Sequence, residues 1–402
     1  MVSLAGIQSA RQRIRDSIYL SPAPYTETLS RATGNTLHLK LENLQVTGAF
    51  KERGALNRLL IMTAEERTRG VIAASAGNHG QAVAYHASKL GIRAQICMPQ
   101  YAPITKVNAV SGYGAEVILH GESFDEALAE AQSRAAREGL TFLHAFDDEA
   151  VIEGQGTIGL ELIEQIPDLD AVVVPVGGGG LLAGVACAIK SIKPSVRMIG
   201  VETARIPSMQ EALRARHPVL LPALSTIADG IAVRRAGDLT LPLFERYVDE
   251  IVTVEDEEIA MAILWLLEKE KTVAEGAGAA GLAAMLRHKT SLQAKKVCVV
   301  ISGGNIDVLM LSHIIERGLV KDGRLVRVRV TLPDHPGALE KLAGLIASEN
   351  ANIVQATHDR TYFGVALGDT LIDLTMETRG PEHVERLLCR IEAAGYPCQR
   401  VR

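Results

Sequence analysis

The stretch AVVVPVGGGGLLAG (residues 171–184) contains a strand pattern, a loop and the start of a helix in immediate succession. Its continuous apolar beginning is typical of a strand buried on both faces. The four glycines that follow allow a close backbone approach to a ligand, with N–H groups directed at it from the helix start. Such a loop suits an anion, and a phosphate best.

The same alternation of short apolar runs and helical periods extends over residues 36–302 and predicts an α/β fold with a mostly parallel, doubly wound sheet. In such a fold, ligands lie at the carboxyl ends of the strands. The runs that we interpret as strands are LHLKLEN (37–43), VIAAS (71–75), AQICMP (94–99), AEVILHG (115–121), TFLHAF (141–146), AVVVPV (171–176), MIGVE (198–202), EIVTVE (250–255) and KVCVVIS (296–302).

The composition excludes several classes of protein. The net charge of −5 is spread without blocks, which argues against nucleic acid as a partner. The N-terminus has no signal-peptide pattern, and no apolar run approaches the length of a membrane span. We therefore expect a soluble cytoplasmic protein that has no membrane partner.

Two ligands compete as interpretations of the glycine loop. Gly178, Gly180 and Ala183 match the dinucleotide fingerprint, and Glu202 ends the next strand where a ribose hydroxyl would lie. A single phosphate monoester would fit the same loop. The loop alone leaves both interpretations open.

The string ENLQVTGAFKERGALN (42–57) decides between them. It resembles the cofactor-lysine signature of the β-family, or fold type II, pyridoxal-phosphate enzymes. The resemblance implies two open, mostly parallel sheets, with pyridoxal 5′-phosphate (PLP) carried on Lys51 and Phe50 packed against the pyridine ring. Ala49 departs from the pattern, because serine is common there.

Three further motifs resemble the same family. ASAGNHGQAVAY (74–85) is similar to the loop that holds the substrate carboxylate, and in it Asn78 would also bond the ring hydroxyl of the cofactor. In ISGGNID (301–307), Ser302 would lie against the pyridine nitrogen. The resemblance implies a carboxylate site at Ser75, Ala76, Gly77, Asn78 and His79, and a phosphate site at Gly177, Gly178, Gly179, Gly180 and Leu181.

The match is closest to the threonine dehydratase and serine racemase branch, and STIADGIAV (225–233) supports this placement. It implies removal of water from L-threonine or L-serine, with release of 2-oxobutanoate or pyruvate and ammonia. Racemases of the family have a serine acid/base where this chain has Ala76, so dehydration is favoured. A hydroxyaspartate dehydratase and a serine racemase are the alternatives within the family. A nicotinamide-dependent oxidoreductase and a catalytically silent amino-acid sensor are the alternatives outside it.

Two acidic residues complete the predicted site. Glu275 resembles an active-site acid of the family, although a simple charge at a helix start would explain it equally well. Glu202 resembles part of a cation site found in some relatives, but Ser208 stands where the magnesium-binding form has an aspartate. We therefore predict no definite metal site.

From residue 323 the pattern changes to a βαββαβ order, which predicts a ferredoxin-like domain. LPDHPGALEKLAGLI (332–346) resembles the opening of an ACT domain, a module that pairs with itself and often binds amino acids. We expect a catalytic domain over residues 1–322, with a smaller subdomain at about 48–146, and a regulatory or dimerisation domain over 323–402. A homodimer or homotetramer follows, with branched-chain amino acids as effectors if the enzyme serves isoleucine synthesis.

Overall fold

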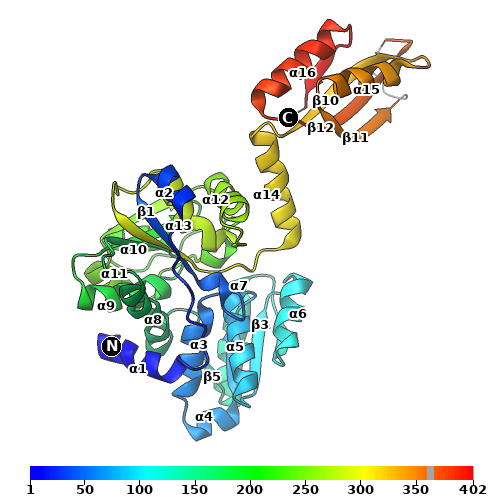
Figure 1. The fold of residues 1–402 in the computed structure, drawn as a ribbon. Helices are drawn as coiled ribbons and strands as arrows, with labels where there is room; N and C mark the ends of the chain where they lie inside the picture. Colours follow the sequence, from blue (N-terminus) through cyan, green and yellow to red (C-terminus); the bar gives the residue numbers. More distant parts are fainter. Residues whose placement is uncertain (360–365, 402) are drawn as a thin grey trace. The chain divides into compact units, whose positions relative to one another are not determined.

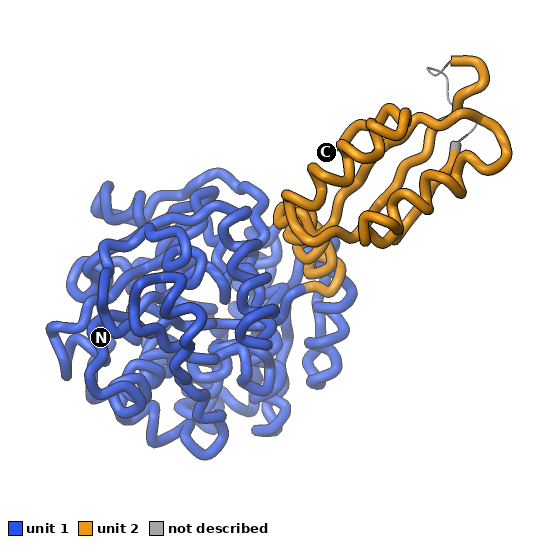
Figure 2. Tube along the Cα trace, turned by 45° about the horizontal axis from the view of Figure 1, so that its top comes forward, with its two compact units in different colours: residues 1–306 blue, residues 307–402 orange. Residues whose placement is uncertain are grey.

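The computed structural model describes residues 1–359 and 366–401 and divides into two compact units, residues 1–306 and 307–402 (Figures 1 and 2). The predicted boundary at residue 323 lies after helix α14 (Val308–Lys321), which belongs to the second unit. No helix in the described residues has both the length and the apolar character needed to cross a bilayer.

Two parallel sheets form the first unit, as the sequence predicts. The larger sheet has the order β1-β9-β6-β7-β8, and the smaller has the order β4-β3-β2-β5. The strands are β1 (Thr36–Leu41), β2 (Val71–Ala74), β3 (Ala94–Met98), β4 (Glu116–Leu119), β5 (Thr141–Phe142), β6 (Ala171–Pro175), β7 (Arg197–Thr203), β8 (Glu250–Val254) and β9 (Lys296–Ile301).

Helices connect these strands and cover both faces of the sheets (Figure 1). They are α1 (Leu4–Ile14), α2 (Glu27–Thr33), η1 (Glu42–Leu44), α3 (Lys51–Leu60), α4 (Ala64–Arg69), α5 (Asn78–Lys89), α6 (Ile104–Gly112), α7 (Phe124–Glu138), α8 (Glu149–Gln165), α9 (Gly180–Ile192), α10 (Ser208–Ala215), η2 (Asp229–Ile231), α11 (Thr240–Tyr247), α12 (Asp256–Lys269) and α13 (Gly276–Leu286).

Successive side chains of β2 point to opposite faces of the smaller sheet, and both faces are buried. Val71 and Ala73 join a core that includes residues of α5, whereas Ile72 and Ala74 join a core that includes residues of α7. Continuous apolar strands are required because neither face meets water. The carboxyl ends of these strands therefore carry the polar groups.

One predicted strand is too long. The run 141–146 forms a strand only over Thr141–Phe142, because Nδ1 of His144 accepts hydrogen bonds from the N–H groups of Phe146 (3.2 Å) and Asp147 (2.8 Å) and turns the chain out of the sheet. The turn frees Ala145 and Phe146 for contacts outside the sheet.

The second unit has the predicted βαββαβ order and an antiparallel sheet with the order β11-β12-β10-β13. This is a ferredoxin-like arrangement. Its elements after α14 are β10 (Leu325–Pro333), α15 (Ala338–Ser348), β11 (Asn352–Asp359), β12 (Asp369–Glu377), α16 (Pro381–Ala393) and β13 (Cys398–Arg400). The predicted strand 352–361 extends beyond Asp359, and its last two residues lie outside the described residues.

Candidate active site

The glycine loop joins β6 to α9 and has the properties of an anion site. Within the described residues, none of the backbone N–H groups from Gly177 to Leu182 donates a hydrogen bond to the protein. These groups precede or begin a helix of 13 residues, where the helix dipole also favours negative charge. Gly179 has φ +97°, a conformation that favours glycine.

The packing around this loop explains why it contains glycines. A Cβ at Gly178 would lie 2.3 Å from the ring of Phe146, and one at Gly180 would lie 2.7 Å from the carbonyl oxygen of the same residue. The hydroxyl of Thr240 donates to the carbonyl of Gly178 at 2.7 Å. Phe146 and Thr240 thus support the loop, although no sequence motif had singled them out.

Lys51 is the first residue of α3, and it is linked to this loop by the segment that contains Phe146. Its Nζ donates to the carbonyl of Ala145 at 2.7 Å, next to Phe146 in the chain. The Nζ also lies 5.0 Å from the centroid of the Phe50 ring. Burial lowers the pKa of Lys51 to about 8, although the carboxylate of Glu275 opposes the shift. An amine with this pKa is a usable base and nucleophile near neutral pH.

The segment between β2 and α5 provides a second set of free N–H groups. Ala76, Asn78 and His79 donate no backbone hydrogen bond within the described residues, whereas Gly77 donates to Oγ of Ser75 at 3.2 Å. The helix α5 begins at Asn78, so its first amides face a site suited to a carboxylate.

His79 contributes a buried atom that lacks a partner. Its Nε2 lies 3.1 Å from the carbonyl of Leu143, which places the ring proton on Nε2. Burial, assisted by the cation of Lys51, lowers the pKa of His79 to about 3, so the ring is neutral. The Nδ1 atom is then a buried acceptor, and no donor among the described residues reaches it.

A chain of hydrogen bonds connects four loops of the site. The amide of Asn78 donates to Glu275 at 2.6 Å and accepts from Asn305 at 2.8 Å. Asn305 also donates to the carbonyl of Thr47, four residues before Lys51, at 2.7 Å. Burial foremost, and Asp229 next, raise the pKa of Glu275 to about 7. Asn305 lies in the motif 301–307 but was not among the predicted site residues.

Ser302 directly follows β9, and its backbone is hydrogen-bonded to the residue before Lys51. Its carbonyl accepts from the N–H of Phe50 at 3.0 Å. Ser302 is 2% exposed, and no hydrogen bond of its hydroxyl is found among residues 1–359 and 366–401. The hydroxyl is therefore free to bond a ligand.

The carboxylate of Glu202 is hydrogen-bonded to the start of helix α10. It accepts from the N–H groups of Met209 (2.8 Å) and Gln210 (2.9 Å), and burial raises its pKa to about 8. These bonds occupy the oxygens that the dinucleotide interpretation would assign to a ribose. In the described part of the chain, no three His, Cys, Asp or Glu residues gather as metal ligands.

Comparisons with known proteins agree with the sequence resemblance. The L-threonine ammonia-lyase of Thermotoga maritima is 49% identical over 396 residues, which cover 98% of each chain. The solved structure of processed threonine deaminase isoform 2 from Solanum lycopersicum has a TM-score of 0.75 and 37% identity, covering 78% of this chain and 86% of that one. Maize serine racemase has a TM-score of 0.75 and 34% identity, covering 80% and 98%.

The family model described as pyridoxal-phosphate dependent enzyme matches residues 14–303, which include both parallel sheets and every site residue described above except Asn305. This match and the identity to the Thermotoga maritima protein have the same consequence. The chain belongs to the family of pyridoxal-phosphate dependent enzymes.

Proposed function

We propose that this protein carries PLP on Lys51 and removes water from L-threonine, and also from L-serine, to release 2-oxobutanoate or pyruvate and ammonia. The observation that carries the proposal is the placement of Lys51. Its amine has a lowered pKa and bonds Ala145, beside the Phe146 that supports the glycine loop. The names of the Thermotoga maritima and Solanum lycopersicum proteins support threonine as the substrate.

The donor set fits the cofactor. Free N–H groups from Gly177 to Leu181 would hold its phosphate, and the amine of Lys51 would bind its carbonyl carbon. The hydroxyl of the buried Ser302 would meet the pyridine nitrogen. Phe50 would pack on the ring, and Asn78 would bond the ring hydroxyl. When bound, PLP supplies an electrophilic carbonyl for the substrate amine and a conjugated ring that stabilises negative charge at Cα.

The chain itself supplies orientation and proton transfer. The N–H groups of Ala76, Asn78 and His79 would hold the substrate carboxylate and orient the Cα–H bond. The amine of Lys51 would then take the Cα proton, because its pKa of about 8 leaves a neutral fraction near pH 7. Glu275, with a pKa of about 7, would hold or release a proton on the same side as Asn78.

Two side chains favour elimination over racemisation. Ser302 has a hydroxyl and no carboxylate, so the chain places no negative charge to retain a proton on the pyridine nitrogen. Lasting negative charge at Cα is then disfavoured, and loss of the β-hydroxyl becomes the easier course. Ala76 has no acid or base with which to return a proton to the other face. Similarity to maize serine racemase keeps racemisation as the second candidate.

Product analysis tests this proposal. The purified protein, loaded with PLP, should release 2-oxobutanoate from L-threonine faster than it releases keto acid from L-serine or 3-hydroxyaspartate. Borohydride should abolish its visible absorption band and leave a reduced adduct on Lys51, detectable by mass spectrometry. A colourless protein, or racemisation faster than keto-acid release, would contradict the proposal.

We further propose that residues 323–402 form an ACT domain that binds a branched-chain amino acid or pairs with a second copy. The turn at Asp334–Gly337 supports this, because Gly337 at φ +87° is the N-cap of α15, and a helix N-terminus of this kind can receive a carboxylate. A cytoplasmic location and a homodimer or homotetramer belong to the same proposal. Sedimentation with and without isoleucine or valine tests it, and a monomer that is unaffected by either amino acid would contradict it.

A further inference from the structure

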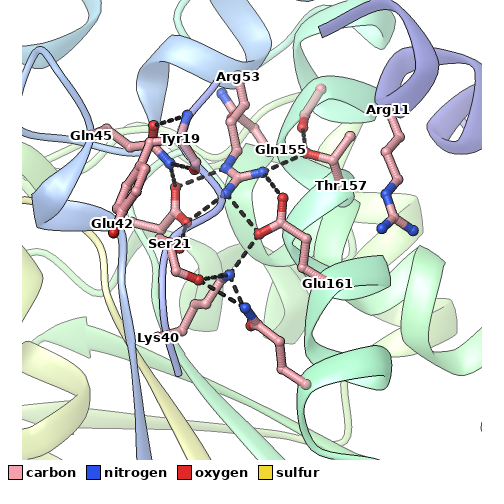
Figure 3. Close-up of polar contacts among 12 residues, drawn as sticks. Arg11, Tyr19, Ser21, Lys40, Glu42, Gln45, Arg53, Gln155, Thr157 and Glu161 are labelled. Atoms are coloured by element: carbon pink, nitrogen blue, oxygen red, sulfur yellow. Dashed lines mark hydrogen bonds and ion pairs between the residues drawn. The ribbon is translucent and has the colours of Figure 1, made fainter. Parts of the chain in front are cut away.

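Two residues after Lys51, the buried Arg53 lies at the centre of a group of charged side chains (Figure 3). We call Lys40, Glu42, Arg53 and Glu161 the Arg53 cluster. Arg53 donates to Glu42 through Nε and Nη2, both at 2.8 Å, and to Glu161 through Nη1 at 2.6 Å and Nη2 at 2.9 Å. Lys40 donates to Glu161 at 2.6 Å. Each member is at most 6% exposed.

The cluster is balanced in charge and saturated in hydrogen bonds. It contains two cations and two carboxylates, and Arg53 also donates to the hydroxyl of Thr157 at 3.1 Å. All five N–H groups of the guanidinium are therefore used. Burial alone would raise the pKa of Glu42, but Arg53, together with Lys40 and the hydroxyl of Ser21, outweighs burial and holds that pKa below its ordinary value. Lysine has no planar fork and could not make the same set of bonds.

The cluster joins the helix of Lys51 to the elements around the site. Arg53 is on α3, Glu42 begins η1 after β1, and Glu161 is on α8. The helices α3 and α8 meet closely, because a Cβ at Gly154 would lie 2.6 Å from the carbonyl of Arg53. Glycine contacts allow close approach but are non-directional, whereas the guanidinium fork permits one register. A slip of one residue along α3 would displace its side chains by about 1.5 Å.

The same two helices determine the environment of Lys51. Its acceptor, the carbonyl of Ala145, lies three residues before Asp148, the residue that caps α8. Lys51 is in the same helical turn as Arg53, so movement of that turn is transmitted to its amine. We propose that the Arg53 cluster is a positioning device that fixes α3 against α8 and thereby holds Nζ of Lys51 at Ala145. The kinetic part of the test below rests on the proposed dehydration of threonine, whereas the labelling part does not.

The test compares Arg53→Lys with Arg11→Lys in the full-length protein. Arg11 is a matched control, because it also forms a two-pronged ion pair with α8, through Glu164 at 2.5 Å for both bonds, but it comes from α1 and is partly exposed. With PLP and L-threonine, Arg53→Lys should lower kcat by about tenfold to a hundredfold and leave KM within about threefold. Arg11→Lys should leave both constants unchanged.

The second readout needs no catalysis. In the cofactor-free full-length chain, acetic anhydride labels neutral amines, and mass spectrometry reports labelling at Lys51 as a function of pH. The wild-type midpoint should be at about 8. In Arg53→Lys it should move toward the ordinary lysine value of 10.5, because the loosened first turn admits water to Nζ. In Arg11→Lys it should not move.

A second variant, Glu42→Gln, removes a partner of Arg53 without touching α3 and should show the same two changes. The proposal is overturned if Arg53→Lys and Glu42→Gln lower only the melting temperature and leave kcat and the labelling midpoint unchanged. It is also overturned if neither variant folds, because the cluster is then a requirement of the fold. A wild type inactive on threonine would refute the proposed function, and the labelling midpoint would still decide the role of the cluster.

Discussion

Lys51 and Arg53 are separated by one residue in the same helical turn, yet their surroundings are opposite. Among the described residues, the amine of Lys51 has one hydrogen-bond acceptor, a carbonyl, and burial lowers its pKa to about 8. Arg53 has five bonds, four of them to carboxylates, and these raise its pKa despite burial. The environment of Lys51 favours its neutral form, whereas the environment of Arg53 favours its charged form. Reactive groups are commonly kept in unfavourable environments that a rigid neighbourhood sustains.

The contrast extends to the atoms around each cation. Near Lys51 lie N–H groups of the glycine loop and Nδ1 of His79, none of which has a hydrogen-bond partner among the described residues, and a carboxyl, Glu275, with a raised pKa. Around Arg53 the guanidinium is saturated and the charges balance. The first region is incomplete without a ligand, and the second is complete without one.

The largest expected effect comes from removing the amine. Lys51→Ala should lower the turnover of threonine by about 10⁴-fold or more, because the proposed base and the proposed attachment point of the cofactor are both lost. Without cofactor, the variant should be more stable than the wild type by on the order of 2 kcal/mol. The folded pKa of Lys51 lies below its unfolded value, so this gain is complete below about pH 8 and disappears as the pH rises through 10.5. Parallel urea titrations at pH 7 and pH 10 measure it.

Lys89→Ala is the control for that experiment, since Lys89 is exposed and its amine lies over the ring of Tyr85, away from the site. It should leave activity and stability nearly unchanged. Equal stability of Lys51→Ala and the wild type at both pH values would contradict the contrast between the two cations.

Removing a charge from the saturated region should have the opposite effect on stability. Glu42→Gln leaves the cation of Arg53 undercompensated in the interior and should lower the free energy of unfolding by about 3 kcal/mol. The folded pKa of Glu42 is depressed, so the wild-type advantage should be full at pH 7 and should shrink as the pH falls below 4.5. Thermal unfolding between pH 4 and pH 8 checks this, and an advantage independent of pH would argue against the charge as its source.

Glu275→Gln tests the raised pKa of the carboxyl group that lies near Lys51. The folded pKa of Glu275 is raised to about 7, so between pH 4.5 and pH 7 the folded state binds a proton that the unfolded state has lost. The free energy of unfolding of the wild type should therefore fall as the pH rises from 4.5 to 7. The variant lacks this loss and should be more stable without cofactor by about 2 kcal/mol at pH 8, with little difference at pH 4.5. Its kcat should also lose the wild-type dependence on a group that titrates near pH 7. An unchanged pH profile would remove Glu275 from the proposed mechanism.

The smallest effect should come from the support of the glycine loop. Thr240→Val removes the hydroxyl that donates to Gly178 and should cost about 1 kcal/mol, seen as a roughly fivefold weaker binding of PLP. Thr240→Ser keeps the hydroxyl and should bind PLP like the wild type. Weaker binding in both variants would assign the effect to packing.

The sequence predicted the parts of the fold and site that depend on local pattern. Apolar runs located the parallel strands, and glycine-rich or polar strings after them located the loops of Lys51, Asn78 and Ser302. The length of β5 was mispredicted because the side chain of His144 turns the chain, which apolar periodicity does not register. A hydrogen bond from a side chain to nearby backbone can end a strand within an apolar run.

Contacts between distant residues were not predictable in this way. Arg53 looks like one more surface charge in a helix, and its partner Glu161 lies 108 residues away. Asn305 lies in the motif 301–307, and Phe146 lies in the predicted strand 141–146, but neither residue had been predicted to belong to the site. Their roles depend on which loops the parallel sheets bring together, and one sequence carries no direct record of that.

The dipeptide Ala145–Phe146 has a consequence for anyone who redesigns this scaffold. One of its carbonyl groups holds the amine of Lys51, and its aromatic ring lies under the glycine loop. In the proposed function, the spacing between Lys51 as the attachment point of the cofactor and the glycine loop as its phosphate site would therefore be set by these two adjacent residues. An engineer who wishes to seat a longer or shorter cofactor analogue should lengthen or shorten the chain at this dipeptide, since substitutions in the glycine loop alone would move one anchor and leave the other behind.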